Sequence, residues 1–129
     1  MVGAYLIDTS AVSQYLEGRF PENGLLFMDG VFTTESTISV ITQIELLTWK
    51  PVQDSMEEKV AIFVEDSTII GLSPEIVLET IRIRRTYRTK TPDAIIAATA
   101  LVHDFTLITD NEKDFNKIQK LKLVNPNKL

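Results

Sequence analysis

The sequence of 129 residues contains no cysteine and a single histidine, His103. Without cysteine it has neither a disulfide framework nor a thiolate metal site, and a reducing compartment, the cytoplasm, is expected. One histidine also excludes a two-histidine metal site. Any metal ion must therefore be held by oxygen ligands, which favours Mg²⁺ or Mn²⁺ over Zn²⁺.

Long apolar runs and excess positive charge are missing too. No run reaches the length of a membrane span, and Asp8 interrupts the apolar N-terminal stretch, so we expect neither a signal peptide nor a membrane partner. The formal net charge of -5 gives no global attraction to nucleic acid. An enzyme that meets phosphate through metal ions can nevertheless be acidic. A Gly-rich phosphate loop and a Ser-His-Asp set are absent as well.

Short apolar runs alternate with helical patterns along the chain, which has the length of one domain, residues 1–129. This alternation predicts an α/β fold with a mostly parallel central sheet of four to five strands. For residues 19–36 we predict a short helix or strand, and for residues 125–129 we predict a tail without regular structure. The predicted strands are 2–7, 37–40, 68–72, 106–109 and 121–124, and the predicted helices are 9–16, 41–50, 54–64, one opening at 73–75 and one opening at 91.

The predicted helix from residue 91 is rich in Ala and Ile and nearly free of charge, so we expect it to be buried on most sides. Thr91 can cap this helix, and Pro92 suits its first position. Its one carboxylate, Asp93, lies in the first turn. An acid there either complements the helix dipole or belongs to a site.

Other acids occur where they could converge on Asp93. Asp8 and Asp110 each follow an apolar strand, and ligands of open α/β sheets bind at the carboxyl ends of the strands. Asp8 either belongs to such a site or is a capping or turn aspartate. Glu45, inside a predicted helix, either reaches solvent or faces those strand ends. Several clustered carboxylates cannot all stay ionised without a cation. One or two Mg²⁺ ions would resolve the repulsion and could activate water against a phosphodiester.

The helix that opens at 73–75 has Ile76, Leu78, Ile81 and Ile83 as core candidates and ends in concentrated positive charge. These cations either are solvated at the helix end, where they interact favourably with the C-terminal end of the helix dipole, or form an RNA-binding patch that contacts phosphates. They are Arg82, Arg84, Arg85, Arg88 and Lys90.

Four parts of the sequence together resemble the signatures of PIN-domain ribonucleases, in particular VapC-type toxins of toxin–antitoxin pairs. They are residues 6–11 (LIDTSA), Glu45, residues 92–100 (PDAIIAATA) and residues 107–115 (LITDNEKDF). The resemblance spans essentially the whole chain. It implies an α/β/α sandwich and a Mg²⁺- or Mn²⁺-dependent endoribonuclease, usually a homodimer, that a cognate antitoxin holds inactive.

Carried over residue by residue, the resemblance assigns the three core acidic positions to Asp8, Glu45 and Asp93. The fourth position best matches Asp114, with Asp110 as the second candidate.

The resemblance also implies supporting residues. Thr9 or Ser10 would support the metal or its waters, and Asn111 would orient the last acids. The local sequence offers structural roles for the same positions. Thr9 or Ser10 can cap the helix over 9–16, and Asn111 can cap a helix from about Glu112, with Asp114 bonding back to the cap.

Two alternatives belong to other functional classes. A non-catalytic PIN-like module would bind RNA or protein without cleaving it, and its mark would be a missing acid. A phospho-accepting receiver domain would need adjacent acids after the first strand, where Thr9 and Ser10 stand. It would also need an aspartate after the third strand, where Ser73 and Pro74 stand, so the receiver is excluded.

Overall fold

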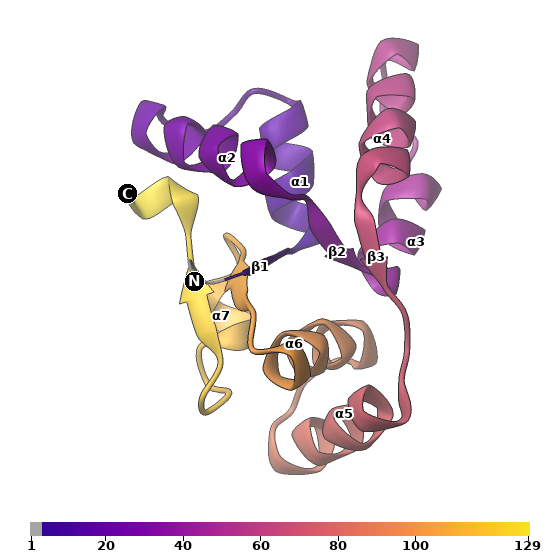
Figure 1. The fold of residues 1–129 in the computed structure, drawn as a ribbon, viewed down its shortest axis with the longest axis vertical. Coiled ribbons are helices and arrows are strands. Elements are labelled where there is room, and N and C mark those ends of the chain that lie inside the picture. The colour runs from indigo at the N-terminus through magenta and orange to yellow at the C-terminus, as the bar shows by residue number, and fades with distance from the viewer. Residues whose placement is uncertain (1–3) are drawn as a thin grey trace.

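The computed structural model describes residues 4–129, in which five strands alternate with seven α-helices and one terminal 3₁₀ helix (Figure 1). The predicted α/β class is confirmed. The strands are β1 (Tyr5–Ile7), β2 (Thr37–Ser39), β3 (Thr68–Ile70), β4 (Thr106–Ile108) and β5 (Lys122–Val124). The helices are α1 (Thr9–Leu16), α2 (Glu22–Thr34), α3 (Val40–Thr48), α4 (Asp54–Asp66), α5 (Pro74–Thr86), α6 (Thr91–His103), α7 (Glu112–Phe115) and η1 (Pro126–Lys128).

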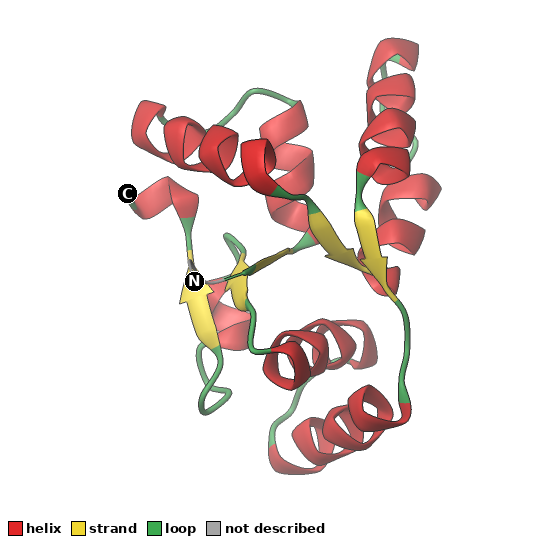
Figure 2. Ribbon diagram, viewed as in Figure 1, coloured by secondary structure: helices red, strands yellow, loops and turns green. Residues whose placement is uncertain are grey.

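The strands form two parallel sheets, so the predicted single sheet of four to five strands is wrong. One sheet has three strands in the order β1-β4-β5, and the other pairs β2 with β3. Strands β1 and β2 lie side by side (Figure 2), but no ladder joins them within residues 4–129. Each strand has only three residues and leads almost at once into a helix, which leaves little extended backbone for a further ladder. Residues 2 and 3 of the first predicted strand lie outside the described residues.

Successive residues of the central strands point to opposite faces of the sheet and enter two different apolar cores. Leu6 and Leu107 pack with α5 and α6, whereas Ile7 and Ile108 pack with α1, α2 and α4. In Figure 1, α5 and α6 cover one side of the strands and α1 and α2 the other. The sheet is therefore the middle layer of an α/β/α sandwich, with both faces buried as parallel strands require.

Helix α6 is the buried centre of one core, as predicted. Ala94, Ala97, Ala98 and Ala100 are fully buried, and such small side chains let α5 and the sheet approach closely. The predicted cap is wrong by one residue, because Thr91 is the first helical residue and Lys90 occupies the cap position.

Helix α5 buries a narrower stripe than the sequence predicts. Ile76 and Ile83 are fully buried, on one face with Thr80. Leu78 and Ile81, two of the predicted core residues, are 69% and 49% exposed. They lie off the stripe that repeats every three to four residues, so the helical period turns them away from α6.

Residues 19–36 and the C-terminal residues 125–129 pack together. The first segment, predicted as a short helix or strand, contains the 13-residue helix α2. The predicted tail at 125–129 is wrong, because η1 packs against α2. At Gly24 an added Cβ would lie 2.2 Å from the Pro126 carbonyl oxygen, so this contact requires glycine. Gln14 of α1 holds Asn127 through hydrogen bonds of 2.6 and 3.1 Å.

No helix in the described range is both long and apolar enough to span a membrane.

Candidate functional site

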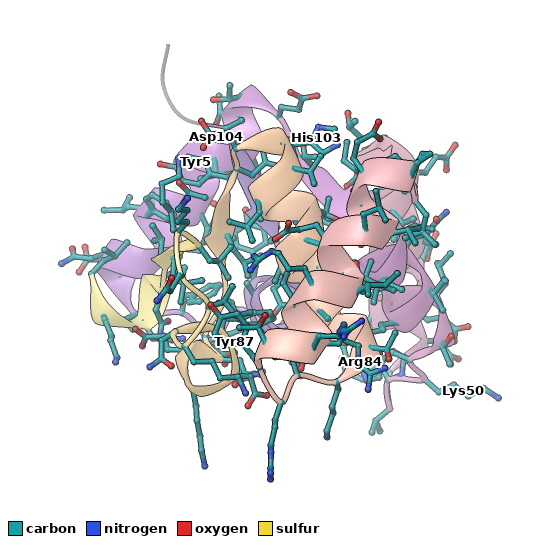
Figure 3. The ribbon with its side chains drawn as sticks, turned by 90° about the horizontal axis from the view of Figure 1, so that it is seen from below. Tyr5, Lys50, Arg84, Tyr87, His103 and Asp104 are labelled. Carbon is teal, nitrogen blue, oxygen red and sulfur yellow. The ribbon has the colours of Figure 1, made fainter. Side chains whose placement is uncertain are left out.

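The carboxyl ends of β1 and β4 and the first turn of α6 meet at one end of the molecule. Figure 3 shows Tyr87, Arg84 and Lys50 toward this end, whereas Tyr5 and His103 lie toward the opposite one. A hollow of about 600 Å³ opens here. Its lining combines acids and hydroxyls from α1, α3, α6 and the loop after β4: Asp8, Thr9, Ser10, Ser13, Glu17, Glu45, Leu46, Trp49, Asp93 and Asn111.

Asp8, directly after β1, is the most enclosed acid of the hollow, with 6% of its surface exposed. Its carboxylate accepts hydrogen bonds from the Thr9 backbone N–H at 2.8 Å and the Ser10 hydroxyl at 3.1 Å. Asp8 is therefore the N-cap of α1, which confirms the capping role considered for it, and the predicted cap at Thr9 or Ser10 is wrong. Burial raises the pKa of Asp8 to about 6, against these hydrogen bonds and with a smaller contribution from the charge of Asp93.

Thr109 is a buried residue of the site that the sequence reasoning missed. Its hydroxyl donates to Asp8 Oδ2 at 2.7 Å and accepts the Asn111 backbone N–H at 3.0 Å. Thr109 therefore connects the loop after β4 to the acid after β1. The available signal was a threonine two residues before an asparagine at a strand end, a common hydroxyl turn.

Glu45 both reaches solvent and faces the carboxyl ends of the strands, the two orientations considered for it. The residue is exposed, yet it lines the hollow and its Oε1 accepts a 2.6 Å hydrogen bond from the Thr9 hydroxyl. The Thr9 hydroxyl also lies 3.1 Å from that of Thr42. The start of α1 thereby orients an acid of α3 toward the hollow.

Asp93 is half-buried in the first turn of α6. Burial, followed by the charges of Asp114 and Glu45, raises its pKa above the ordinary value, while Lys90 and Lys117 act in the opposite direction. Asp93 thus lies within electrostatic reach of acids from two other helices.

Asn111, Asp114 and Asp110 occupy different surroundings after β4. Asp114 is the third residue of α7, as predicted, and accepts a 2.8 Å bond from the Asn111 side-chain amide. Asn111 occupies the N-cap position and Asp114 bonds back to it, as predicted, but the bond comes from the Asn111 side-chain amide, which makes no cap hydrogen bond to the helix backbone. Asp110 is exposed and Asp114 is partly buried, and neither residue lines the hollow.

The four acids Asp8, Glu45, Asp93 and Asp114 have a donor set suited to a hard divalent cation. All their ligand atoms are carboxylate oxygens, and the ion pairs found in residues 4–129 leave all four without a cationic partner. No group of three acids in that range is close enough to share one ion. Hydroxyl and amide donors of the protein bind three of the four carboxylates individually.

The five cations at the end of α5 and after it, here called the basic run, differ in their contacts: Arg82, Arg84, Arg85, Arg88 and Lys90. Arg82 pairs with Glu79, and the Arg84 Nε donates to the Thr89 carbonyl at 3.2 Å. The side chains of the other three cations are exposed: Arg85, Arg88 and Lys90. Within the described part of the chain, none of the five lines the acidic hollow.

Lys117 is a further cation near this region, and the sequence reasoning missed it. Its Nζ donates to the Arg88 carbonyl at 2.8 Å, and its charge lowers the pKa of Asp93. Lys117 therefore lies between the basic run and the acidic hollow.

Comparison with known proteins identifies similar chains. A family model described as "PIN domain" matches residues 5–121. A toxin–antitoxin complex from Klebsiella pneumoniae contains a chain 30% identical, with a TM-score of 0.74 over 95% of this chain and 97% of the other. No curated protein matches the sequence.

Two structures of lower identity share the fold. A chain of VapBC2 from Rickettsia felis, bound to a promoter DNA fragment, is 22% identical with a TM-score of 0.78 over 94% of this chain and 97% of the other. A chain of DNA-bound VapBC from Salmonella typhimurium is 19% identical with a TM-score of 0.79 over 97% and 99%. The PIN match extends from the first strand to beyond α7 and includes Asp8, Glu45, Asp93 and Asp114.

Proposed function

Because this chain belongs to the PIN domain family, we propose that it is a metal-dependent endoribonuclease that hydrolyses RNA phosphodiester bonds. The observation that carries the proposal is the hollow into which Asp8, Glu45 and Asp93 face from three separate elements. Burial and mutual repulsion raise the pKa values of Asp8 and Asp93. A bound divalent cation would relieve that repulsion.

Asp8, Glu45, Asp93 and Asp114 would hold Mg²⁺ or Mn²⁺. When bound, the ion would lower the pKa of its water and offset negative charge on the phosphodiester. We favour Asp114 over Asp110 as the fourth acid, because the charge of Asp114 raises the pKa of Asp93 and the Asn111 amide holds its carboxylate, whereas Asp110 is exposed.

The residues around the acids would keep each carboxylate in place. Ser10 and Thr109 donate to Asp8, Thr9 donates to Glu45, and Asn111 donates to Asp114. Hydrogen-bonded partners of this kind orient the ligands of metal sites and adjust their basicity. We assign Thr9, Ser10 and Asn111 this supporting role, and we add Thr109 to them.

RNA phosphates would be contacted by the basic run that precedes Asp93. Arg85, Arg88 and Lys90 are exposed, whereas Arg82 and Arg84 also have partners within the protein. Cations that neutralise phosphates release counterions, so binding through this run would weaken as salt increases.

The 30% identical chain comes from a toxin–antitoxin complex, and on this ground we propose that the present chain is the toxin of such a pair. It would act in the cytoplasm and be restrained by a cognate antitoxin. We further propose a homodimer, since Val77, Leu78 and Ile81 leave an exposed apolar surface on α5.

A non-catalytic PIN-like module is the second candidate function. One observation favours it: across residues 4–129, no three acids are close enough to hold a common ion. Such a module would bind RNA or a protein equally well with and without divalent metal.

The experiment that separates the two functions is cleavage of a labelled RNA by the purified protein in Mg²⁺, in Mn²⁺ and in excess EDTA. The Asp93→Asn variant, purified identically, controls for contaminating ribonuclease. Metal-dependent cleavage by the wild type alone supports the nuclease, and equal cleavage by both proteins rejects it.

A further inference from the structure

Trp49, the only tryptophan of the chain, lies where two hollows adjoin. It follows α3, and part of its side chain packs against the core formed with α1 and α4. The remainder lines both the acidic hollow and a second one of about 460 Å³. Glu17 lines both as well, so the two hollows adjoin at Trp49 and Glu17.

The second hollow has the chemical groups of a nucleotide site. Trp49 supplies an aromatic wall, and Pro51, Val52 and Met56 add apolar surface. Lys50, which also lines this hollow, is exposed. Figure 3 shows Lys50 extending outward at the end of the molecule where Tyr87 and Arg84 lie.

Gln53 adds a hydrogen-bonding group to the same hollow. It occupies the N-cap position of α4, and among the hydrogen bonds of residues 4–129 its side-chain amide is not used for the cap. An amide has both donors and an acceptor, so it can bond the edge of a base.

We propose that the second hollow binds an unpaired RNA base, which stacks on Trp49 while Lys50 contacts its phosphate and Gln53 its edge. This inference rests on the proposed ribonuclease function and adds to it a base-binding contact beside the acidic hollow. A base can reach an aromatic side chain in this way only when it is free of its helical partner.

The charge of the protein gives an independent reason for a stacking contact. The formal net charge of -5 gives the protein no overall attraction for the RNA backbone, and the acidic hollow itself is not lined by the exposed cations Arg85, Arg88 and Lys90. Stacking on an aromatic ring is independent of backbone charge and works with every base. Trp49 therefore supplies affinity at the place where electrostatic attraction is weakest.

Because Trp49 is the sole tryptophan, its intrinsic fluorescence reports on this position directly. The full chain is titrated in EDTA with oligoadenylate, and separately with the same strand annealed to oligouridylate. We expect a saturable loss of fluorescence with the single strand and little change with the duplex. Equal loss with both RNAs, or no loss with the single strand, overturns the proposal.

Variants supply the second measurement, by anisotropy of labelled oligoadenylate. Trp49→Leu should weaken binding roughly tenfold, and Trp49→Phe, which keeps an aromatic face, should recover most of it. Leu26→Ala is the matched control, since Leu26 is 63% exposed on α2 and lies away from both hollows. Wild-type affinity in Trp49→Leu would overturn the stacking contact.

The same experiments distinguish this inference from the function beneath it. If the wild type cleaves RNA in the presence of metal but its Trp49 fluorescence does not change with RNA, the nuclease function is supported and only the base-binding site is rejected. Absence of both RNA binding and cleavage would remove both. A fluorescence change with a purified antitoxin but with neither RNA would assign the hollow to a protein and overturn the proposal.

Discussion

The Thr109 hydroxyl donates a 2.7 Å hydrogen bond to Asp8 Oδ2, which joins the residues that follow β4 and β1. The bond depends on the register of the parallel pair, in which Ile7 lies opposite Ile108. It stabilises the charged form of Asp8 against burial, which raises the pKa of that carboxyl.

Thr109→Val removes this bond without a large change in volume. The pKa of Asp8 should rise further, and cleavage should fall roughly tenfold with its pH dependence moved toward higher pH. Thr109→Ser keeps the hydroxyl and is the control. A pH–rate profile of the valine variant that coincides with that of wild type would show that Thr109 has no effect on Asp8.

Asp93→Asn should lower cleavage on the order of a thousandfold, since removing a charged group that holds the ion removes several kcal/mol of stabilisation. In EDTA the same variant should melt at or above the wild-type temperature, because burial and two acids raise the pKa of Asp93. Cleavage assays beside melting curves test both parts. Wild-type activity would leave Asp93 as a residue that only complements the helix dipole.

The stability of the metal-free protein should decrease as pH rises from about 4 to about 6. Folding raises the pKa of Asp8 from 3.8 to about 6, so the folded state holds this proton more tightly than the unfolded state. This proton adds roughly 3 kcal/mol to the free energy of unfolding. The contribution is fully present below pH 3.8 and is lost as the pH rises through about 6.

Urea unfolding across this pH range, in EDTA, measures the effect of Asp8. Asp8→Asn, which can still cap α1, should remove most of the pH dependence. A variant with the same pH dependence as wild type would place the titrating group elsewhere.

Asp114→Asn should reduce cleavage roughly a hundredfold and raise the Mn²⁺ concentration needed for half-maximal rate. Asp110→Asn should change the rate far less, because Asp110 is exposed and, unlike Asp114, is not among the charges that shift the pKa of Asp93. Rates measured against Mn²⁺ concentration, with melting curves for both variants, separate metal binding from stability. The reverse order of effects would move the fourth acidic position to Asp110.

How much was predictable depended on whether the information was local. The Asp93 helix could be predicted because Pro92 and a run of alanines mark its start and its burial within a few residues. The sheet could not be counted correctly, because strands of three residues carry almost no pairing information.

The convergence of Asp8, Glu45 and Asp93 on one hollow was predictable from their places in the sequence, but their contacts were not. The bond from Thr9 to Glu45 spans α1 and α3, and that from Thr109 to Asp8 spans nearly the whole chain. Neither follows from local spacing. The assignment of the four acids to metal binding stays a prediction until a metal-dependent activity is measured.

The most direct test is cleavage of labelled single-stranded RNA by the purified protein across a titration of Mn²⁺, followed by excess EDTA. The account predicts cleavage that rises and saturates with Mn²⁺, stops after chelation and is lost in Asp93→Asn. Cleavage that continues unchanged in EDTA, or that the Asp93→Asn protein performs at the wild-type rate, would contradict it.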